Sequence, residues 1–377
     1  MPPAVRMAFT GLERWLLEDA YPLWRERGAD RINGGWFDRL NLDGTPVVGP
    51  KRLRVQARQA HVFALAPSLG WTGPAEEACN HGLQFILDHC QRRDGLYRSN
   101  VEAAGAPIDE VAELYDQAFV ILALASHEAA FGGGADMATL LEGSLMDYHH
   151  RLGGCMEAPG RVEPLLANPN MHLFESYLAW MPLTVDRIWS ALAAGQARLA
   201  LTRLIDPATG AISETYGADW RPVEPPAARA VWPGHLFEWA WLLLRWPDGD
   251  DASRAAALRL IEVGERAGVD RQRGVAMFAL DGELRPTDRR ARLWAQTERI
   301  KALALAAELT GDEGLWAGVL QGCESLGRFL DVPTRGLWRD WMDEGGGFAI
   351  EPAPASSFYH IVGAIAELER LTQGAVE

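Results

Sequence analysis

The sequence has few cysteines, no strongly basic segment and no long hydrophobic run. Its four cysteines are Cys79, Cys90, Cys155 and Cys323. They form no CxxC pair and no zinc-ligand spacing, a pattern typical of reduced thiols in a cytoplasmic protein. No run of about 18 apolar residues is present, and the charged residues among positions 1–20 are unlike a signal peptide. We therefore expect a cytoplasmic protein that does not cross a membrane.

Positive charge is also scarce. The formal net charge is −15 and lysines and arginines form no cluster, which argues against partners such as nucleic acids or anionic membrane surfaces. The sequence contains no GxxxxGK[ST], GxGxxG or GxSxG motif, so nothing supports a nucleotide cofactor or a serine hydrolase. His127-Glu128 lacks the second histidine of a zinc protease motif. A site of three histidines for a metal is conceivable, but we expect neither a metal nor a cofactor.

Tryptophan, by contrast, is abundant. The chain has 377 residues with 48% hydrophobic and 23% charged residues, an ordinary globular composition, but it includes 15 tryptophans. Many of these will be core residues. Indole faces also stack on the C–H surfaces of pyranoses, so the composition is compatible with a sugar-binding protein.

The segment 231–246 begins with Pro233-Gly234 and continues as a helix-forming run. His235 and Glu238 share one face of its first turn, and apolar residues cover the other faces, which predicts a buried helix. The helix dipole at this end disfavours a charged imidazolium. A neutral imidazole there can accept a proton, although a satisfied core histidine is the simpler interpretation.

The same unit of structure recurs along the chain: an amphipathic helix, a glycine-containing hairpin or loop, and an apolar helix. The amphipathic helices are expected at 8–28, 75–91, 136–151, 185–204, 252–267 and 313–330. The apolar helices are expected at 53–69, 111–130, 168–180, 233–246, 293–304 and 356–366. Six copies of one unit predict an all-α fold, a single (α/α)6 barrel or toroid of twelve helices with short β-hairpins at one rim. We expect one domain over residues 1–377.

In such a barrel the apolar helices run in one direction, so their first turns meet at one rim. Polar residues that recur at intervals of 56 to 63 positions would collect there: Arg58, Asp116, His172, His235, Glu298 and His360, with Glu238 beside His235. Singly, each has an ordinary explanation; Glu298, for example, fits a surface i,i+3 ion pair with Lys301. Their joint recurrence favours a site, in a cavity that we expect to be lined by several of Trp36, Tyr115, Trp294 and Phe358.

Neutral histidines flanked by an arginine and carboxylates suit proton abstraction next to a carbonyl. The base needs a pKa near 7, and the developing enediolate needs hydrogen-bond donors. His235 and His360 come from the fourth and sixth apolar helices and would flank a ligand as the catalytic pair. Arg58 is a natural donor to the oxyanion, and Glu238 would orient a neighbouring imidazole.

Five motifs then carry a family resemblance. They are Arg58-Gln-Ala-His61, Asn168-Pro-Asn-Met-His-Leu-Phe-Glu175, Pro233-Gly-His-Leu-Phe-Glu-Trp239, Trp294-Ala-Gln-Thr-Glu298 and Phe358-Tyr-His360. In this order, over roughly residues 33–368, they resemble the N-acylglucosamine 2-epimerase superfamily, which includes mannose isomerases and cellobiose 2-epimerases. The resemblance implies the (α/α)6 barrel and an isomerase or epimerase.

The resemblance also implies residue roles. His235 and His360 match the catalytic histidine pair of the family. Sugar-binding and supporting positions fall on Arg58, Asn168, His172, Glu238, Trp294 and Glu298, with Tyr115 and Asp116 at the same rim and Arg229 assigned to a further family arginine. The segment Ala355-Ser-Ser-Phe-Tyr-His360 departs from the better-known members. The resemblance therefore constrains the chemistry more than the substrate.

The function expected from the sequence is aldose–ketose isomerisation of a free hexose, of the mannose-to-fructose type, through a cis-enediolate. The alternative is a sugar 2-epimerase acting on an N-acylglucosamine or on mannose and glucose. A more distant alternative is an (α/α)6 glycoside hydrolase with Asp116 and Glu298 as its carboxylates. We expect a monosaccharide substrate as the only partner and a monomer or homodimer.

Overall fold

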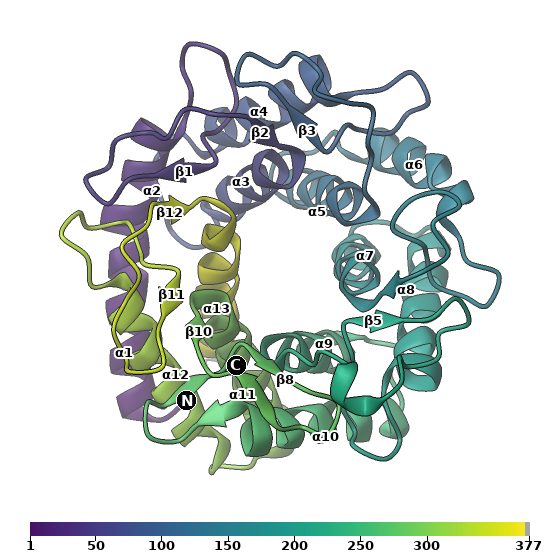
Figure 1. The fold of residues 1–377 in the computed structure, drawn as a ribbon. Helices are drawn as coiled ribbons and strands as arrows, with labels where there is room; N and C mark the ends of the chain where they lie inside the picture. Colours follow the sequence, from purple (N-terminus) through teal and green to yellow (C-terminus); the bar gives the residue numbers. More distant parts are fainter. Residues whose placement is uncertain (374–377) are drawn as a thin grey trace. The chain divides into compact units, whose positions relative to one another are not determined.

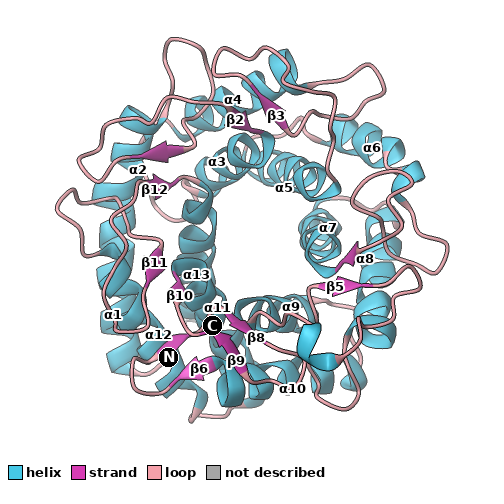
Figure 2. Ribbon diagram, in the orientation of Figure 1, coloured by secondary structure: helices cyan, strands magenta, loops and turns pink. Residues whose placement is uncertain are grey.

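The structure is a computed structural model that describes residues 1–373, and it is an all-α protein in which the strands are short (Figure 2). The helices, labelled in Figure 1, are α1 (Pro3–Arg14), α2 (Tyr21–Leu23), α3 (Leu53–Leu65), α4 (Ala75–Phe85), α5 (Leu114–Ala130), α6 (Ala135–Ser144), α7 (Ala167–Trp180), α8 (Ile188–Leu199), α9 (Pro233–Arg245), α10 (Asp251–Gly268), α11 (Leu293–Thr310), α12 (Leu315–Leu330) and α13 (Ser356–Gln373). No described helix is both long enough and apolar enough to span a bilayer.

Short π-helical and 3-10 turns extend several helices. The π-helical turns are η1 (Trp15–Ala20), η2 (Trp24–Gly28), η3 (Ile86–Cys90) and η6 (Ala200–Leu204). The 3-10 turns are η4 (Met146–Tyr148), η5 (Met181–Leu183) and η7 (Pro226–Ala228). The amphipathic helix expected at 8–28 begins earlier than expected, at Pro3. The one expected at 136–151 consists of α6 followed by η4. The apolar helices expected to end at 304 and 366 continue to Thr310 and Gln373.

The strands contain two or three residues each. They are β1 (Arg39–Leu40), β2 (Lys51–Arg52), β3 (Asn100–Val101), β4 (Leu165–Leu166), β5 (Thr215–Tyr216), β6 (Val269–Asp270), β7 (Val275–Ala276), β8 (Ala279–Leu280), β9 (Pro286–Asp288), β10 (Ala291–Arg292), β11 (Trp341–Met342) and β12 (Ala353–Pro354). The described strands pair antiparallel as β1 with β12, β2 with β3, β6 with β7, β8 with β9 and β10 with β11. In register, Ala291 faces Met342 and Arg292 faces Trp341, directly before α11 begins.

The chain divides into two compact units. The first unit contains residues 1–16, 198–351 and the chain from 360 onward, and the second contains residues 17–197 and 352–359. In the first unit α9 packs on α10 and α11, α11 packs on α12, and α12 packs on α1 (Figure 1). In the second, α3 packs on α4 and α5, and α5 packs on α6 and α7. Within each unit, therefore, apolar helices pack on one another and on the amphipathic helix that follows.

Local sequence explains where these helices begin and end. Pro233 stands in the first turn of α9, where its missing N–H costs nothing. Asp250 caps α10 by accepting a hydrogen bond from the backbone N–H of Ser253. α11 ends at Gly311, whose φ of 70° is the left-handed conformation that glycine adopts easily. α9 is buried on nearly all sides, as its sequence predicts.

At four places in the chain, a repeated amide contact fixes a hairpin on the helix that follows it. The fourth residues of α3, α5, α7 and α11 are Gln56, Gln117, Asn170 and Gln296. Each side chain bonds both the N–H and the C=O of one hairpin residue, respectively Trp36, Tyr97, Cys155 and Ala276. Because buried backbone groups need partners, these amides satisfy the hairpin and anchor it at the start of the helix.

The helix starts also correct the expected repeat positions. Counted from the first helical residue, Arg58, His172, Glu238 and Glu298 are all sixth, whereas Asp116 and His235 are third and His360 is fifth. These residues therefore do not all occupy the same position in their helices. Hairpins of unequal length precede the helices, so intervals of 56 to 63 positions do not fix the position within a turn.

Candidate active site

His235 lies at the start of α9 with its Nδ1 held by a carboxylate. The Nδ1–H donates to Glu214, whose two oxygens are both 2.9 Å away, and the imidazole is 6% exposed. Glu214 belongs to the segment between α8 and α9, directly before β5. A carboxylate only accepts hydrogen bonds, so it fixes the proton of the neutral ring on Nδ1 and makes Nε2 the basic nitrogen. The indole of Trp232 packs on the imidazole of His235, with 4.9 Å between the ring centroids.

His360 has the same type of anchor, but its carboxylate is shared. The Nδ1–H of His360 donates to Glu298 Oε1 at 2.8 Å, and Glu298 is fully buried. The second oxygen of Glu298 accepts a hydrogen bond from the ammonium of Lys301 at 2.6 Å. The expected i,i+3 pair of Glu298 and Lys301 therefore exists. It is a buried pair, however, and the surface interpretation is wrong, because the Lys301 side chain is 2% exposed.

Trp294, the second residue of α11, lies against both imidazoles. The centroid of its ring is 4.9 Å from that of His235 and 5.7 Å from that of His360, with interplanar angles of 38° and 36°. This approach depends on Gly234, since a Cβ at that position would lie 2.3 Å from Cζ3 of Trp294. Two anchored imidazoles thus pack on one indole.

Glu238 completes this group. One ligand atom from each of Glu238, Glu298 and His360 lies within 4.8 Å of the other two, and all three residues are buried. Such spacing is compatible with a divalent cation, but both oxygens of Glu298 already accept hydrogen bonds, one of them from a lysine ammonium. We call the group of Glu214, His235, Glu238, Trp294, Glu298, Lys301 and His360 the histidine cluster. It belongs to the first unit.

A second group, in the other unit, is built around Arg58. The guanidinium is 5% exposed and donates to the Tyr115 hydroxyl at 2.7 Å and to the carbonyl of Ser356 at 3.2 Å. Its Cζ lies 4.0 Å from the ring centroid of Phe119 and 4.9 Å from that of Tyr359. Arg58 is thus a buried cation whose hydrogen-bond partners are a phenol and a carbonyl, not carboxylates.

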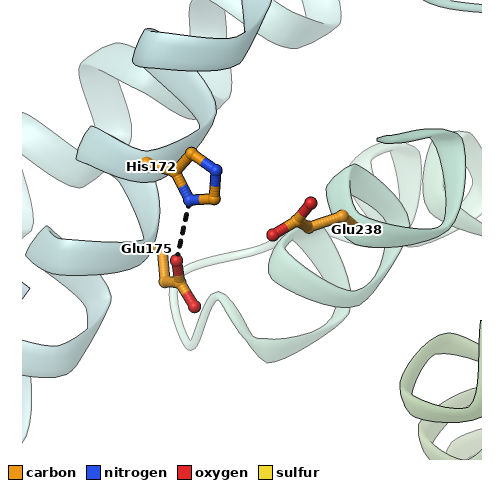
Figure 3. Close-up of side chains that lie close together, drawn as sticks. All are labelled: His172, Glu175 and Glu238. Carbon is orange, nitrogen blue, oxygen red and sulfur yellow. Dashed lines mark hydrogen bonds and ion pairs between the residues drawn. The ribbon is translucent and has the colours of Figure 1, made fainter. Parts of the chain in front are cut away.

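His172 adjoins the same aromatic rings. Its Nδ1–H donates to Glu175 Oε2 at 3.0 Å, as Figure 3 shows, and the other oxygen of Glu175 accepts a hydrogen bond from the Tyr359 hydroxyl. The imidazole is 4.5 Å from Phe119 and 5.2 Å from Tyr115, centroid to centroid. We call the group of Arg58, Tyr115, Phe119, His172, Glu175 and Tyr359 the arginine cluster.

Three further expected site residues belong to neither cluster. Asp116 is fully buried and faces Arg54, whose Nη1 is 3.3 Å from its Oδ1. Burial raises the pKa of Asp116 to about 6, against the opposing effect of the Arg54 charge. Arg229 pairs with Asp206 at 2.9 Å and with Glu224 at 2.5 Å. Asn168 is the second residue of α7, and its side-chain oxygen accepts no hydrogen bond from any described residue.

Two of the aromatic residues expected to line a cavity are core residues instead. Trp36 is fully buried and stacks on Phe63, with centroids 4.9 Å apart. Phe358 is also fully buried and packs on Tyr21 and Trp24.

Sequence reasoning missed Glu214 as the partner of His235 and did not assign a role to Lys301, Glu175 or Tyr359. The sequence did indicate a possible contact between Glu175 and His172, since Glu175 stands three residues after His172 on the same helix face. The same spacing suggested Glu238 as the partner of an imidazole, but Glu214 has that position beside His235. No local pattern connects Glu214 to a histidine 21 positions later.

Comparisons with known proteins agree with this architecture. The family profile described as N-acylglucosamine 2-epimerase (GlcNAc 2-epimerase) matches residues 35–364. A relative from Rhizobium meliloti (strain 1021), named mannose-6-phosphate isomerase, is 40% identical over 370 residues, covering 95% of this chain and 96% of its own. A D-mannose isomerase of Thermobifida fusca is 29% identical over 330 residues, covering 80% of each chain.

A solved structure of a D-mannose isomerase has a TM-score of 0.88 at 21% identity, covering 96% of this chain and 98% of its own. This likeness confirms the all-α, (α/α)6 fold class. The chain belongs to the N-acylglucosamine 2-epimerase family. It is therefore an enzyme of the isomerase and epimerase class.

Proposed function

We propose that the enzyme converts an aldohexose of the mannose type into the corresponding ketose by moving a proton from C2 to C1. The observation that carries the proposal is the pair of buried imidazoles, His235 and His360, packed on the indole of Trp294. Each ring has its Nδ1 bound to a carboxylate. Histidine titrates near neutral pH, so such a pair suits acid–base catalysis on a carbon acid.

In the proposed reaction, one imidazole of this pair removes a proton from the substrate and later returns it. With the sugar ring open, the Nε2 of one neutral imidazole takes the C2 proton, and the electrons of that bond form the C1=C2 double bond. The negative charge develops on the oxygen at C1, giving a cis-enediolate. Transfer of the O2 proton to that oxygen, and return of the abstracted proton from the imidazolium to C1, then yield the ketose with its carbonyl at C2. The anchoring carboxylate stabilises the imidazolium that forms in between.

Remaining site residues receive binding roles. For Arg58 we assign donation to the oxyanion, and for His172, Tyr115, Asn168, Asp116, Glu238 and Arg229 binding or support of the sugar. The support differs among them. Among the described residues, Arg58 is a buried cation whose hydrogen-bond partners include no carboxylate, and the side-chain oxygen of Asn168 accepts no hydrogen bond. Asp116 and Arg229, whose charges are paired, have the weakest support. Trp294 offers an apolar face for the C–H surface of the sugar.

A neutral monosaccharide is the substrate that the charges favour. The histidine cluster contains the carboxyl groups of Glu214, Glu238 and Glu298 against the single ammonium of Lys301, which is bound to Glu298. A phosphate dianion would meet net negative charge there. The relatives named for mannose 6-phosphate and for D-mannose make both sugars the substrates to compare. We therefore propose free mannose.

The 2-epimerase reaction is the second candidate, favoured by the presence of two similarly anchored imidazoles. If the opposite histidine returns the proton to C2, mannose gives glucose and no fructose. Incubation of mannose in D2O followed by NMR separates the outcomes. Fructose labelled at C1 supports the isomerase, and glucose labelled at C2 without fructose supports the epimerase. Turnover of mannose 6-phosphate or N-acetylglucosamine instead of mannose would overturn the substrate assignment.

The proposal also includes the domain organisation, the cellular compartment and the oligomeric state of the protein. The family match from residue 35 to residue 364 includes segments of both compact units, which supports one functional domain over the whole chain. All four cysteines are buried and free, which suits a reducing compartment such as the cytoplasm. We propose a monomer or homodimer, to be measured by light scattering.

A further inference from the structure

Resting on the proposed function, we infer that Lys301 is a positioning residue that controls, through Glu298, how readily His360 takes up a proton. The geometry is a buried line of three groups. The Lys301 ammonium is 2.6 Å from Glu298 Oε2, and Glu298 Oε1 is 2.8 Å from Nδ1 of His360. Glu298 is fully buried, so water does not weaken these interactions.

Lys301 is held in this place from its other side. Its ammonium lies over the indole of Trp241, 3.7 Å from the ring centroid, where the electron-rich face of the indole stabilises a cation. The Nε1–H of Trp241 donates to Glu367 at 3.0 Å, and Glu367 is paired with Arg370. The position of the ammonium is therefore fixed by packing as well as by charge.

The second histidine of the cluster has a different arrangement. Glu214 presents both oxygens to His235, each 2.9 Å from Nδ1. Within residues 1–373, Glu214 forms no ion pair with a lysine or arginine. The negative charge of Glu214 beside His235 is thus not offset by a lysine or arginine of residues 1–373, whereas the negative charge of Glu298 beside His360 is offset by Lys301. Two imidazoles that look alike in sequence differ in the charge of their partners.

This difference has a chemical consequence for His360. The charged groups near it within the histidine cluster include Glu298 and Lys301 from α11 and Glu238 from α9. With Lys301 present, Glu298 and Lys301 together carry no net charge, which favours a neutral imidazole that can act as a base. Without Lys301, the buried carboxylate of Glu298 loses the ammonium that offsets its charge. The Glu298–His360 pair then takes up a proton and stops accepting one from substrate.

The test compares Lys301→Met with Lys301→Arg, which keeps the charge. Two readouts are used: the pH profile of kcat, and an NMR titration of the His360 Cε1–H signal, assigned by its loss in His360→Gln. For Lys301→Met we expect the acid limb and the NMR midpoint to move up by about one pH unit. Lys301→Arg should restore both. The control is Arg299→Met, which removes a buried cation of α11 that is bound to Glu265; it should leave both values unchanged.

A double variant, Lys301→Met with Glu298→Gln, keeps the test decisive if Lys301→Met does not fold. It removes both charges, so no uncompensated carboxylate remains, and its NMR midpoint should not exceed that of the wild type. An unchanged midpoint in folded Lys301→Met, or a midpoint in the double variant raised by about one pH unit, would overturn the inference. The NMR readout needs no turnover, so it stands even if mannose is not the substrate.

Discussion

The Nδ1 of His235 lies 2.9 Å from each of the two carboxylate oxygens of Glu214. This contact joins the first turn of α9 to a residue of the preceding hairpin. It fixes which ring nitrogen carries the proton and how the ring is turned. The catalytic assignment of His235 therefore depends on a residue that no motif identifies.

Replacing Glu214 should test that dependence. Glu214→Gln keeps the size of the side chain but allows its amide to donate to Nδ1, which favours the wrong tautomer. We expect kcat to fall by about 10²–10⁴-fold, with little change in KM. Steady-state kinetics and circular dichroism measure the two effects. Full activity in a folded Glu214→Gln protein would show that the tautomer of His235 is not important for catalysis.

Loss of either histidine of the pair should abolish most activity. For His235→Ala and His360→Ala we expect kcat to fall by about 10²–10⁴-fold, because each variant removes a general acid–base group. Each should still fold, as judged by circular dichroism. The exposed His149, replaced by alanine, is the control and should retain wild-type kinetics. Near-full activity of either cluster variant would show that the catalytic pair is assigned wrongly.

A side chain at Gly234 should also reduce activity, because Trp294 packs closely against this position. An alanine Cβ would lie 2.3 Å from the Trp294 indole, so the ring must shift from the position in which it packs on the two imidazoles. We expect Gly234→Ala to lower both the melting temperature and kcat. The control is Gly327→Ala, also within a helix, where an added Cβ meets no atom within 4 Å and should be neutral or slightly stabilising. A Gly234→Ala enzyme with wild-type kcat would separate the position of Trp294 from catalysis.

Stability should depend on pH through Glu142, a buried carboxyl group that accepts a hydrogen bond from the Tyr177 hydroxyl at 3.0 Å. Burial raises its pKa from 4.5 to about 7. Between these values the folded state holds a proton that the unfolded state has lost. The free energy of unfolding therefore falls as pH rises from 4.5 to 7, and above pH 7 the loss is complete, at about 3 kcal/mol.

Glu142→Gln should remove this contribution while keeping an acceptor for Tyr177. Urea denaturation at pH 5 and pH 8 should show the variant stabilised mainly at the higher pH, and the exposed control Glu102→Gln should show no such difference. Equal effects of Glu142→Gln at both pH values would contradict the raised pKa of Glu142.

The sequence predicted the helices and most members of the two clusters because the signals are local. Hydrophobic periodicity identified the alternating helices, and Pro233 located the start of α9. His172, His235 and His360 stand in short motifs at helix starts. These are properties of adjacent residues and need no knowledge of the three-dimensional packing.

What the sequence did not predict depends on contacts between distant segments. An i,i+3 pair such as Glu298 and Lys301 has the same pattern on a surface and in a core, so its burial was missed. Glu214 lies in an irregular segment whose backbone conformation no periodicity describes. Because the hairpins differ in length, the sequence spacing did not give the exact positions of the polar residues in each helix. The pairing of Asp116 with Arg54 was not predicted either.

The amide contacts at the helix starts have a consequence for how the hairpins respond to catalysis. Gln56, Gln117 and Gln296 hold their hairpins with groups that never change charge, so those attachments are the same at every pH and at every step. In α9 the fourth residue is Leu236, whose side chain cannot form such a bond, and His235 contacts the preceding segment through Glu214. That attachment strengthens whenever the imidazole is protonated. Under the proposed mechanism, the hairpin before α9 is thus held by a contact whose strength changes with the protonation of His235.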